Sequence, residues 1–192
     1  IVVVVLLLLG MYGCSTYNGL VSKDETVNSA WANVQSAYQR RADLIPNLVN
    51  TVKGAADFEK STLTAVIEAR AKATQVTVDP ANITPEQLAQ FNQAQSGVSS
   101  SLSRLLVTVE NYPNLKANEN FLKLQDELAS TENQILTART RFNEAVQKYN
   151  NYILVFPNSM FLGNYKEKPY FDAVAGAEKP VDVKFNFSND KK

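Results

Sequence analysis

The sequence predicts an all-α protein, a long-helix antiparallel bundle of about four helices that follows an N-terminal transmembrane helix. Residues 1–9 carry no polar side chain, and the apolar run continues to Cys14. The rest of the chain is polar overall but carries apolar residues at a spacing near that of packed helices. The seven Gly and seven Pro fall between these periodic segments, which is typical of few long elements with short connections.

The apolar run at the start of the chain predicts membrane attachment. It covers about 14 residues, or roughly 21 Å of helix, whereas a complete span needs about 20 residues. Since the first residue is Ile, we expect a transmembrane helix over residues 1–17 whose start precedes this sequence. A lipoprotein signal is an alternative, because the small Gly13 precedes Cys14, and a conventional secretory signal peptide is another. The side of the membrane stays open, because only Lys23 among the basic residues lies near the run.

Charge and composition argue against several classes of function. Lys plus Arg number 19, as do Asp plus Glu, so no basic excess is available to bind nucleic acid. The chain has no His and one Cys, which removes the usual general base, the usual nitrogen ligand of metals and any intramolecular disulfide. The Glu residues are interpreted as solvated helix faces. We therefore expect no enzyme activity, no cofactor and no metal site.

The first helix of the bundle has the clearest apolar stripe, with steps of four and three residues. The stripe comprises Val27, Trp31, Val34, Tyr38, Ile45, Leu48, Val52 and Ala55. Only Arg41 interrupts it. Because an unpaired buried Arg is costly, we expect Arg41 to pair with a carboxylate, either Glu132 or Glu144, while Arg40 is solvated. The alternative is that both arginines bind an anionic lipid or a phosphate.

Two residues near the end of this helix affect its backbone. Pro46 removes a hydrogen bond and crowds the carbonyl group of Ala42, which predicts a kink over residues 42–45, or else a functional hinge. Gly54 predicts the end of the helix, in the left-handed conformation that commonly follows a helix.

Local signals place the remaining helices. Asp57 is an acceptable N-cap for a second helix that ends before Val76. Thr84 and Pro85, with Glu86 and Gln87 behind them, form a start signal for the third helix, whose apolar stripe comprises Leu88, Phe91, Val98, Leu102, Leu105, Val109 and Tyr112. The fourth helix is predicted over residues 118–156.

Pro157 is predicted to end the fourth helix. The resulting division is an anchor over residues 1–17, a helical bundle over 18–157 and an irregular tail over 158–192. Alternating apolar residues at 181–187 indicate one short strand or an extended arm in the tail. If the helices alternate in direction, the fourth returns to the membrane. Four residues then lie near the lipid headgroups: Phe156, Met160, Phe161 and Leu162.

Two segments resemble the signature regions of the LemA family. They are RRADLIPNLVNTVKGAADFEKSTLTAVIEARAKA at residues 40–73, and YNNYILVFPNSMF with the following YKEKPYF within 149–171. The resemblance implies a bacterial, single-pass membrane protein with a helical-bundle domain. It brings no catalytic residues, because the family has no agreed biochemical function. Relatives often have His where this chain has Phe58, so a role for that imidazole does not transfer.

These observations favour a membrane-tethered scaffold or interaction module of the bacterial envelope. Its partners would be the lipid bilayer, other membrane or envelope proteins, and further copies of itself. The alternative is a protein that binds or shapes the membrane surface, although the balanced charge argues against a purely electrostatic attachment.

Overall fold

The computed structural model describes residues 1–54 and 58–171 of the chain, and over these residues every regular element is a helix. The elements are α1 (Val2–Lys53), α2 (Lys60–Gln75), the single 3-10 turn η1 (Pro80–Asn82), α3 (Pro85–Val109), α4 (Pro113–Lys116), α5 (Glu119–Leu154) and α6 (Asn158–Leu162). The predicted all-α class is confirmed, and the described residues form four long helices and two short α-helices that the periodicity did not reveal.

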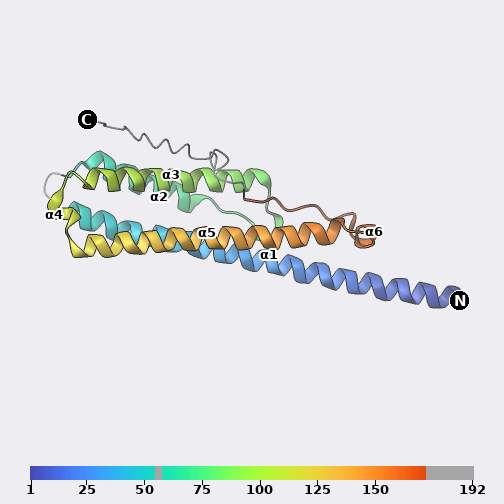
Figure 1. Ribbon diagram of the computed structural model, residues 1–192. Helices are drawn as coiled ribbons and strands as arrows, with labels where there is room; N and C mark the ends of the chain where they lie inside the picture. The colour runs from blue at the N-terminus through green and yellow to red at the C-terminus, as the bar shows by residue number, and fades with distance from the viewer. Residues whose placement is uncertain (55–57, 172–192) are drawn as a thin grey trace, which may run out of the picture.

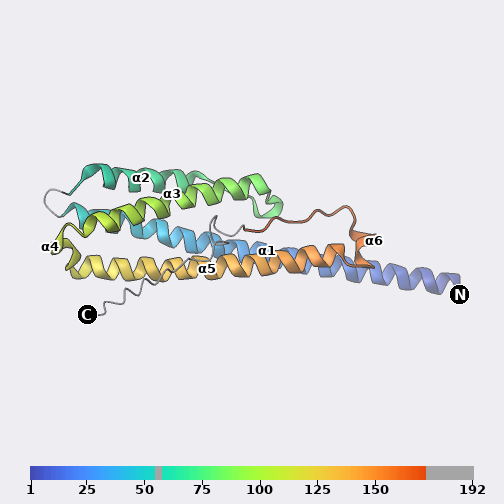
Figure 2. The same cartoon turned by 45° about the horizontal axis from the view of Figure 1, so that its top comes forward.

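The four long helices form two layers. One layer is α1 packed along α5, and the other is α2 packed along α3 (Figures 1 and 2). The chain runs away from the N-terminus in α1, back in α2, away again in α3 and back in α5. This alternation of direction agrees with the prediction. As a result α6 lies beside Tyr12 and Gly13 of α1, and the turns of α1 that precede them extend beyond the bundle (Figure 1).

Helix α1 is continuous from the apolar segment into the bundle, so the boundary predicted between residues 17 and 18 falls inside one helix of 52 residues. Gly19 permits close packing of α5 against α1. A Cβ atom at Gly19 would lie 2.1 Å from Oη of Tyr152, which is far inside van der Waals contact. The same Tyr152 hydroxyl donates a hydrogen bond of 3.1 Å to the carbonyl oxygen of Thr16. Gly19 is therefore where α5 approaches the backbone of α1.

The ends of α1 and α2 differ in part from the predictions. Helix α1 ends at Lys53, but Gly54 is right-handed, with φ −69° and ψ −15°, so the predicted left-handed cap is wrong. The Gly54 N–H instead donates to the carbonyl oxygen of Thr51 at 3.3 Å, which closes the last turn tightly. Helix α2 begins at Lys60 with Glu59 at the N-cap, and Asp57 lies outside the described residues.

The start of α3 agrees with its sequence signal. The Thr84 hydroxyl accepts a hydrogen bond from the Gln87 N–H, and the Gln87 side chain accepts one from the Thr84 N–H. Pro85 occupies the first helical turn. This reciprocal pair satisfies two backbone donors that a helix start otherwise leaves unpaired.

Helix α5 ends at Leu154, two residues earlier than predicted, and Pro157 precedes a further short helix, α6. Residues 158–162 are therefore helical and not irregular. Beyond α6 the chain runs without regular structure to Phe171, back along the bundle (Figure 2). The alternating residues at 181–187 lie outside the described part of the chain.

Two asparagines of α5 hold this returning segment. The Asn150 side chain accepts from the Lys168 N–H at 2.8 Å and donates to the Lys168 carbonyl oxygen at 2.9 Å. Asn143, two turns earlier, makes the same pair of hydrogen bonds with Phe171, at 2.8 and 3.1 Å. Each amide thus provides hydrogen-bond partners for backbone groups of a segment that has no regular structure.

The buried residues form two clusters along the bundle. The cluster nearer the N-terminus surrounds Trp31, whose ring contacts Phe91, Phe142 and Phe171. The other surrounds Leu48, Val66 and Leu105. Arg41 belongs to neither apolar cluster, although it is also buried.

Candidate functional site: a buried arginine cluster and an exposed apolar patch

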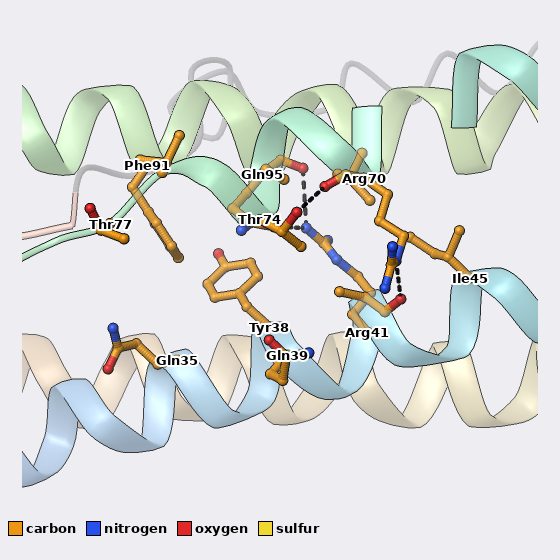
Figure 3. A pocket seen from close by; sticks show the side chains of 14 residues that line it. Gln35, Tyr38, Gln39, Arg41, Ile45, Arg70, Thr74, Thr77, Phe91 and Gln95 are labelled. Carbon is orange, nitrogen blue, oxygen red and sulfur yellow. Dashed lines mark hydrogen bonds between the residues drawn. The ribbon is translucent and has the colours of Figure 1, made fainter. Parts of the chain in front are cut away.

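Arg41 connects α1 to α3 and α5 through side-chain hydrogen bonds. Its side chain is 2% exposed, and Nη1 donates to Oγ of Ser99 at 2.9 Å and to Oε1 of Glu132 at 2.8 Å. Nη2 donates to the carbonyl oxygen of Gln95 at 3.2 Å and to its Oε1 at 2.6 Å. The guanidinium points from α1 toward Gln95 of α3 (Figure 3). One side chain thereby joins α1, α3 and α5.

The structure answers which carboxylate accompanies this arginine. Glu132 forms the ion pair with Arg41, whereas Glu144 is exposed and lies three turns further along α5. Arg40 is exposed as predicted. Because Nη1 and Nη2 of the buried Arg41 donate to protein acceptors, the two adjacent arginines do not present a joint anion site.

Tyr38 lies one turn before Arg41 and faces the same cluster. The Arg41 guanidinium carbon is 5.1 Å from the centroid of the Tyr38 ring, a cation–π distance. Burial raises the pKa of the Tyr38 phenol above its ordinary value, although the guanidinium groups of Arg139 and Arg41 oppose this shift. The phenol is therefore neutral at physiological pH and does not act as a base there.

Arg70 of α2 contacts the backbone of α1 at the turn that Pro46 interrupts. Pro46 has no N–H, so the carbonyl group of Ala42 lacks its helical partner. Nε of Arg70 donates to that carbonyl oxygen at 2.7 Å. The sequence indicates that Ala42 needs a partner but not which residue provides it. The helix continues through Pro46, and the kink stays a prediction.

A cleft of about 200 Å³ lies beside this cluster. It is smaller than the roughly 300–1,000 Å³ typical of ligand pockets. Its polar lining consists of amides, hydroxyls and the two guanidinium groups, and no Asp or Glu lines it. Within residues 1–54 and 58–171, no three His, Cys, Asp or Glu side chains gather as a metal site would require. The cluster can therefore hold three helices together, but it offers no pair of reacting groups.

A second feature lies at the end of the bundle nearer the N-terminus (Figure 1) and is called here the α6 patch. It consists of exposed apolar residues at the end of α5, in the connection that follows it and on α6: Leu154, Val155, Phe156, Met160 and Phe161. Phe156 and Met160 are 74% and 73% exposed. The predicted contact residue Leu162 is different, because it is 2% exposed and belongs to the buried cluster around Trp31. The turn of α6 directs Leu162 inward, so its assignment to the membrane is wrong.

The α6 patch lies against the apolar start of α1. Oη of Tyr12 donates to Oδ1 of Asn158 at 2.8 Å, and the Tyr12 and Phe161 rings are 5.6 Å apart between centroids. A Cβ atom on Gly13 would be 3.6 Å from the Phe161 ring. Among the described helices, α1 alone is long and apolar enough to cross a membrane, and that segment is almost entirely exposed.

Comparison with known proteins gives a consistent set of relatives. Residues 30–185 match the model of the LemA family. Magnetosome protein MamQ 2 of Paramagnetospirillum magneticum and magnetosome protein MamQ of Magnetospirillum gryphiswaldense are each 24% identical to this chain, over 86% of its length and 68% of theirs. Protein LemA of Metamycoplasma hominis is 25% identical, over 72% of this chain and 60% of its own length.

Proposed function

The chain belongs to the LemA family, and from this premise we propose that it is a membrane-tethered scaffold of the bacterial envelope. In this proposal α1 fixes the bundle to the bilayer, and the bundle holds other membrane or envelope proteins, or copies of itself, at a defined height. No catalytic step is part of the proposal.

The continuity of α1 is the observation that carries this proposal. The helix has 52 residues, or about 78 Å at about 1.5 Å per residue. Its first turns are exposed and apolar, whereas from Leu20 onward it contributes one side of the core. A flexible linker would let the domain move freely over the membrane. A continuous helix instead makes the bundle an extension of the span, which suits a protein that positions partners.

A polar groove between α1 and α5 is the surface we assign to a partner. It has a volume of about 550 Å³ and is lined by these two helices alone. Its walls carry two cationic side chains, Arg40 and Arg141, among amide and hydroxyl groups, and Ala37 and Ala138 lie at its base. Small buried residues at the base let a partner approach closely, and the cations favour a partner with carboxylates along the contact.

In-cell photocrosslinking tests this assignment. A photoreactive amino acid would replace Asn133 in the groove of the full-length protein, and the matched control would replace Arg104, an exposed residue of α3. We expect a crosslinked product of defined mass from the groove position only, identified by mass spectrometry as an envelope protein or a second copy. Arg141→Glu should abolish that product, while the circular dichroism spectrum stays that of a helical protein. Equal products from both positions, or none from the groove, would contradict the proposal.

A further inference from the structure

Two segments that are far apart in the sequence lack charged residues over the same stretch of the molecule. On α1 the first charged residue is Lys23, so residues 1–22 carry none. At the other end of the chain no charge occurs between Lys148 and Lys166. This second interval includes the end of α5, all of α6 and therefore the whole α6 patch.

The structure places these two uncharged segments side by side. Tyr12 contacts Asn158 and Phe161, and Tyr152 hydrogen-bonds to the backbone of Thr16. Both views show α6 on one side of α1, level with the apolar segment (Figures 1 and 2). The lack of charge is therefore a property of one end of the molecule and not of two unrelated loops.

The exposed side chains at this end have the composition of a membrane–water interface. Besides the α6 patch, three tyrosines are exposed there: Tyr12 at 39%, Tyr17 at 54% and Tyr165 at 42%. Tyrosine has an apolar ring and a polar tip, which is why it is enriched at the level of lipid headgroups. A cluster of Phe, Met and Leu in water would be costly, since each loses the free energy of apolar burial.

We propose that the α6 patch inserts into the interfacial region of the bilayer, next to the span formed by α1. This inference rests on the tethering by α1 proposed above. The occupant is the lipid bilayer, because the patch continues the apolar surface of the span. The contact relies on apolar insertion and not on anionic headgroups, since no cation lies within it. Because the patch projects on one side of α1, it also fixes the rotation of the bundle about the span.

Site-specific fluorescence quenching tests the insertion. The native Cys14 is exposed, so it is first replaced in a Cys14→Ser protein. An environment-sensitive dye is then attached to Met160→Cys in the patch, or to the control Leu136→Cys, which is 66% exposed on α5 far from α6. A third protein, Leu8→Cys, reports on the span. Each is reconstituted in phosphatidylcholine vesicles that contain lipids with a spin-label quencher near the headgroup, with aqueous iodide as the opposite quencher.

The dye at residue 160 should be quenched several-fold more by the lipid quencher than the dye at residue 136, and less by iodide. High salt and added anionic lipid should leave this difference unchanged. If residue 8 is quenched by lipid but residue 160 behaves like residue 136, the patch faces water and the inference is overturned while the tether stands. If residue 160 is quenched only in anionic vesicles, insertion by apolar contact is overturned. If residue 8 is not quenched either, the tether and the patch contact both fail.

Discussion

At the scale of single residues, Arg41 is a charge held in the middle of a helical bundle. Burying a guanidinium is unfavourable unless its donors are satisfied and its charge is offset. Here four hydrogen bonds to Gln95, Ser99 and Glu132 occupy it. The Glu132 side chain is 47% exposed, so this ion pair keeps one end in water and desolvates the carboxylate only in part.

Replacing Arg41 should therefore destabilise the protein, because Arg41→Ala removes charged hydrogen bonds and leaves a space between three helices. We expect the free energy of unfolding to fall by about 3 kcal/mol. Arg40→Ala is the matched control and should change it by less than about 0.5 kcal/mol. Chemical unfolding of the detergent-solubilised chain, followed by circular dichroism, measures both. Equal and small effects at the two positions would show that Arg41 is not buried.

Because of Tyr38, the free energy of unfolding should depend on pH in the alkaline range. Burial raises its pKa above the ordinary value of 10.0, so the folded state retains the phenolic proton at a pH where the unfolded chain releases it. Stability from this group is therefore complete below about pH 10 and decreases as pH rises further. Tyr38→Phe should weaken this decrease in unfolding titrations across that range. Some dependence should persist, because burial and the nearby Asp24 also raise the pKa of Tyr149. An unchanged pH dependence in the variant would contradict this assignment.

At the scale of elements, α2 contacts α1 at the turn of α1 that lacks one backbone hydrogen bond. Pro46 leaves the Ala42 carbonyl without its helical partner, and Arg70 of α2 donates to that carbonyl. This contact explains how a proline is tolerated inside a long helix: a neighbouring helix provides the missing donor. It also fixes the register between the two helices, because only one carbonyl is freed.

A double-mutant cycle tests this connection. Arg70→Met should lower the free energy of unfolding by about 1–2 kcal/mol, because it leaves the carbonyl unpaired. In a Pro46→Ala background the same change should cost clearly less, since the new backbone N–H restores the helical hydrogen bond. Lys72→Met, at an exposed position of α2, serves as the control for loss of a cation. Additive effects of the two substitutions would mean that Arg70 does not compensate for the proline.

At the scale of the whole molecule, the alternating directions of the helices determine which parts lie near the membrane. The end of α5 and α6 lie beside Tyr12, whereas the end of α1 lies at the far end of the bundle (Figure 1). Asn50 is 38 residues beyond Tyr12 on α1, which corresponds to about 57 Å of helix. Asn151 is on α5 near the returning end.

Energy transfer to acceptor lipids should distinguish the distances of Asn50 and Asn151 from the membrane. In the Cys14→Ser protein, a donor dye at Asn151→Cys should transfer strongly to acceptors in the bilayer, and a donor at Asn50→Cys should transfer weakly. Both positions are exposed, so labelling should leave the core intact. Similar transfer from the two positions would mean that the bundle lies along the membrane or that its helices run in other directions.

Features that depend on residues close together in the chain were predictable from the sequence. The apolar spacing identified four long helices, and Thr84 with Gln87 marked the start of α3, because helix period and capping act within a turn or two. The position of Arg41 in the apolar stripe of α1 also predicted a polar partner, whichever helix packs against that stripe. These signals are local, so they do not depend on how the helices are finally arranged.

Which distant groups meet follows from the packing of the helices against one another. Glu132 and not Glu144 pairs with Arg41, and Arg70 donates to the carbonyl oxygen of Ala42. Asn150 and Asn143 hydrogen-bond to the backbone of residues 168 and 171. Leu162 is buried in the core, whereas its neighbours Met160 and Phe161 are exposed. These outcomes depend on helix rotation and register, which are set by packing over the whole bundle. A single sequence contains no short-range signal for either quantity.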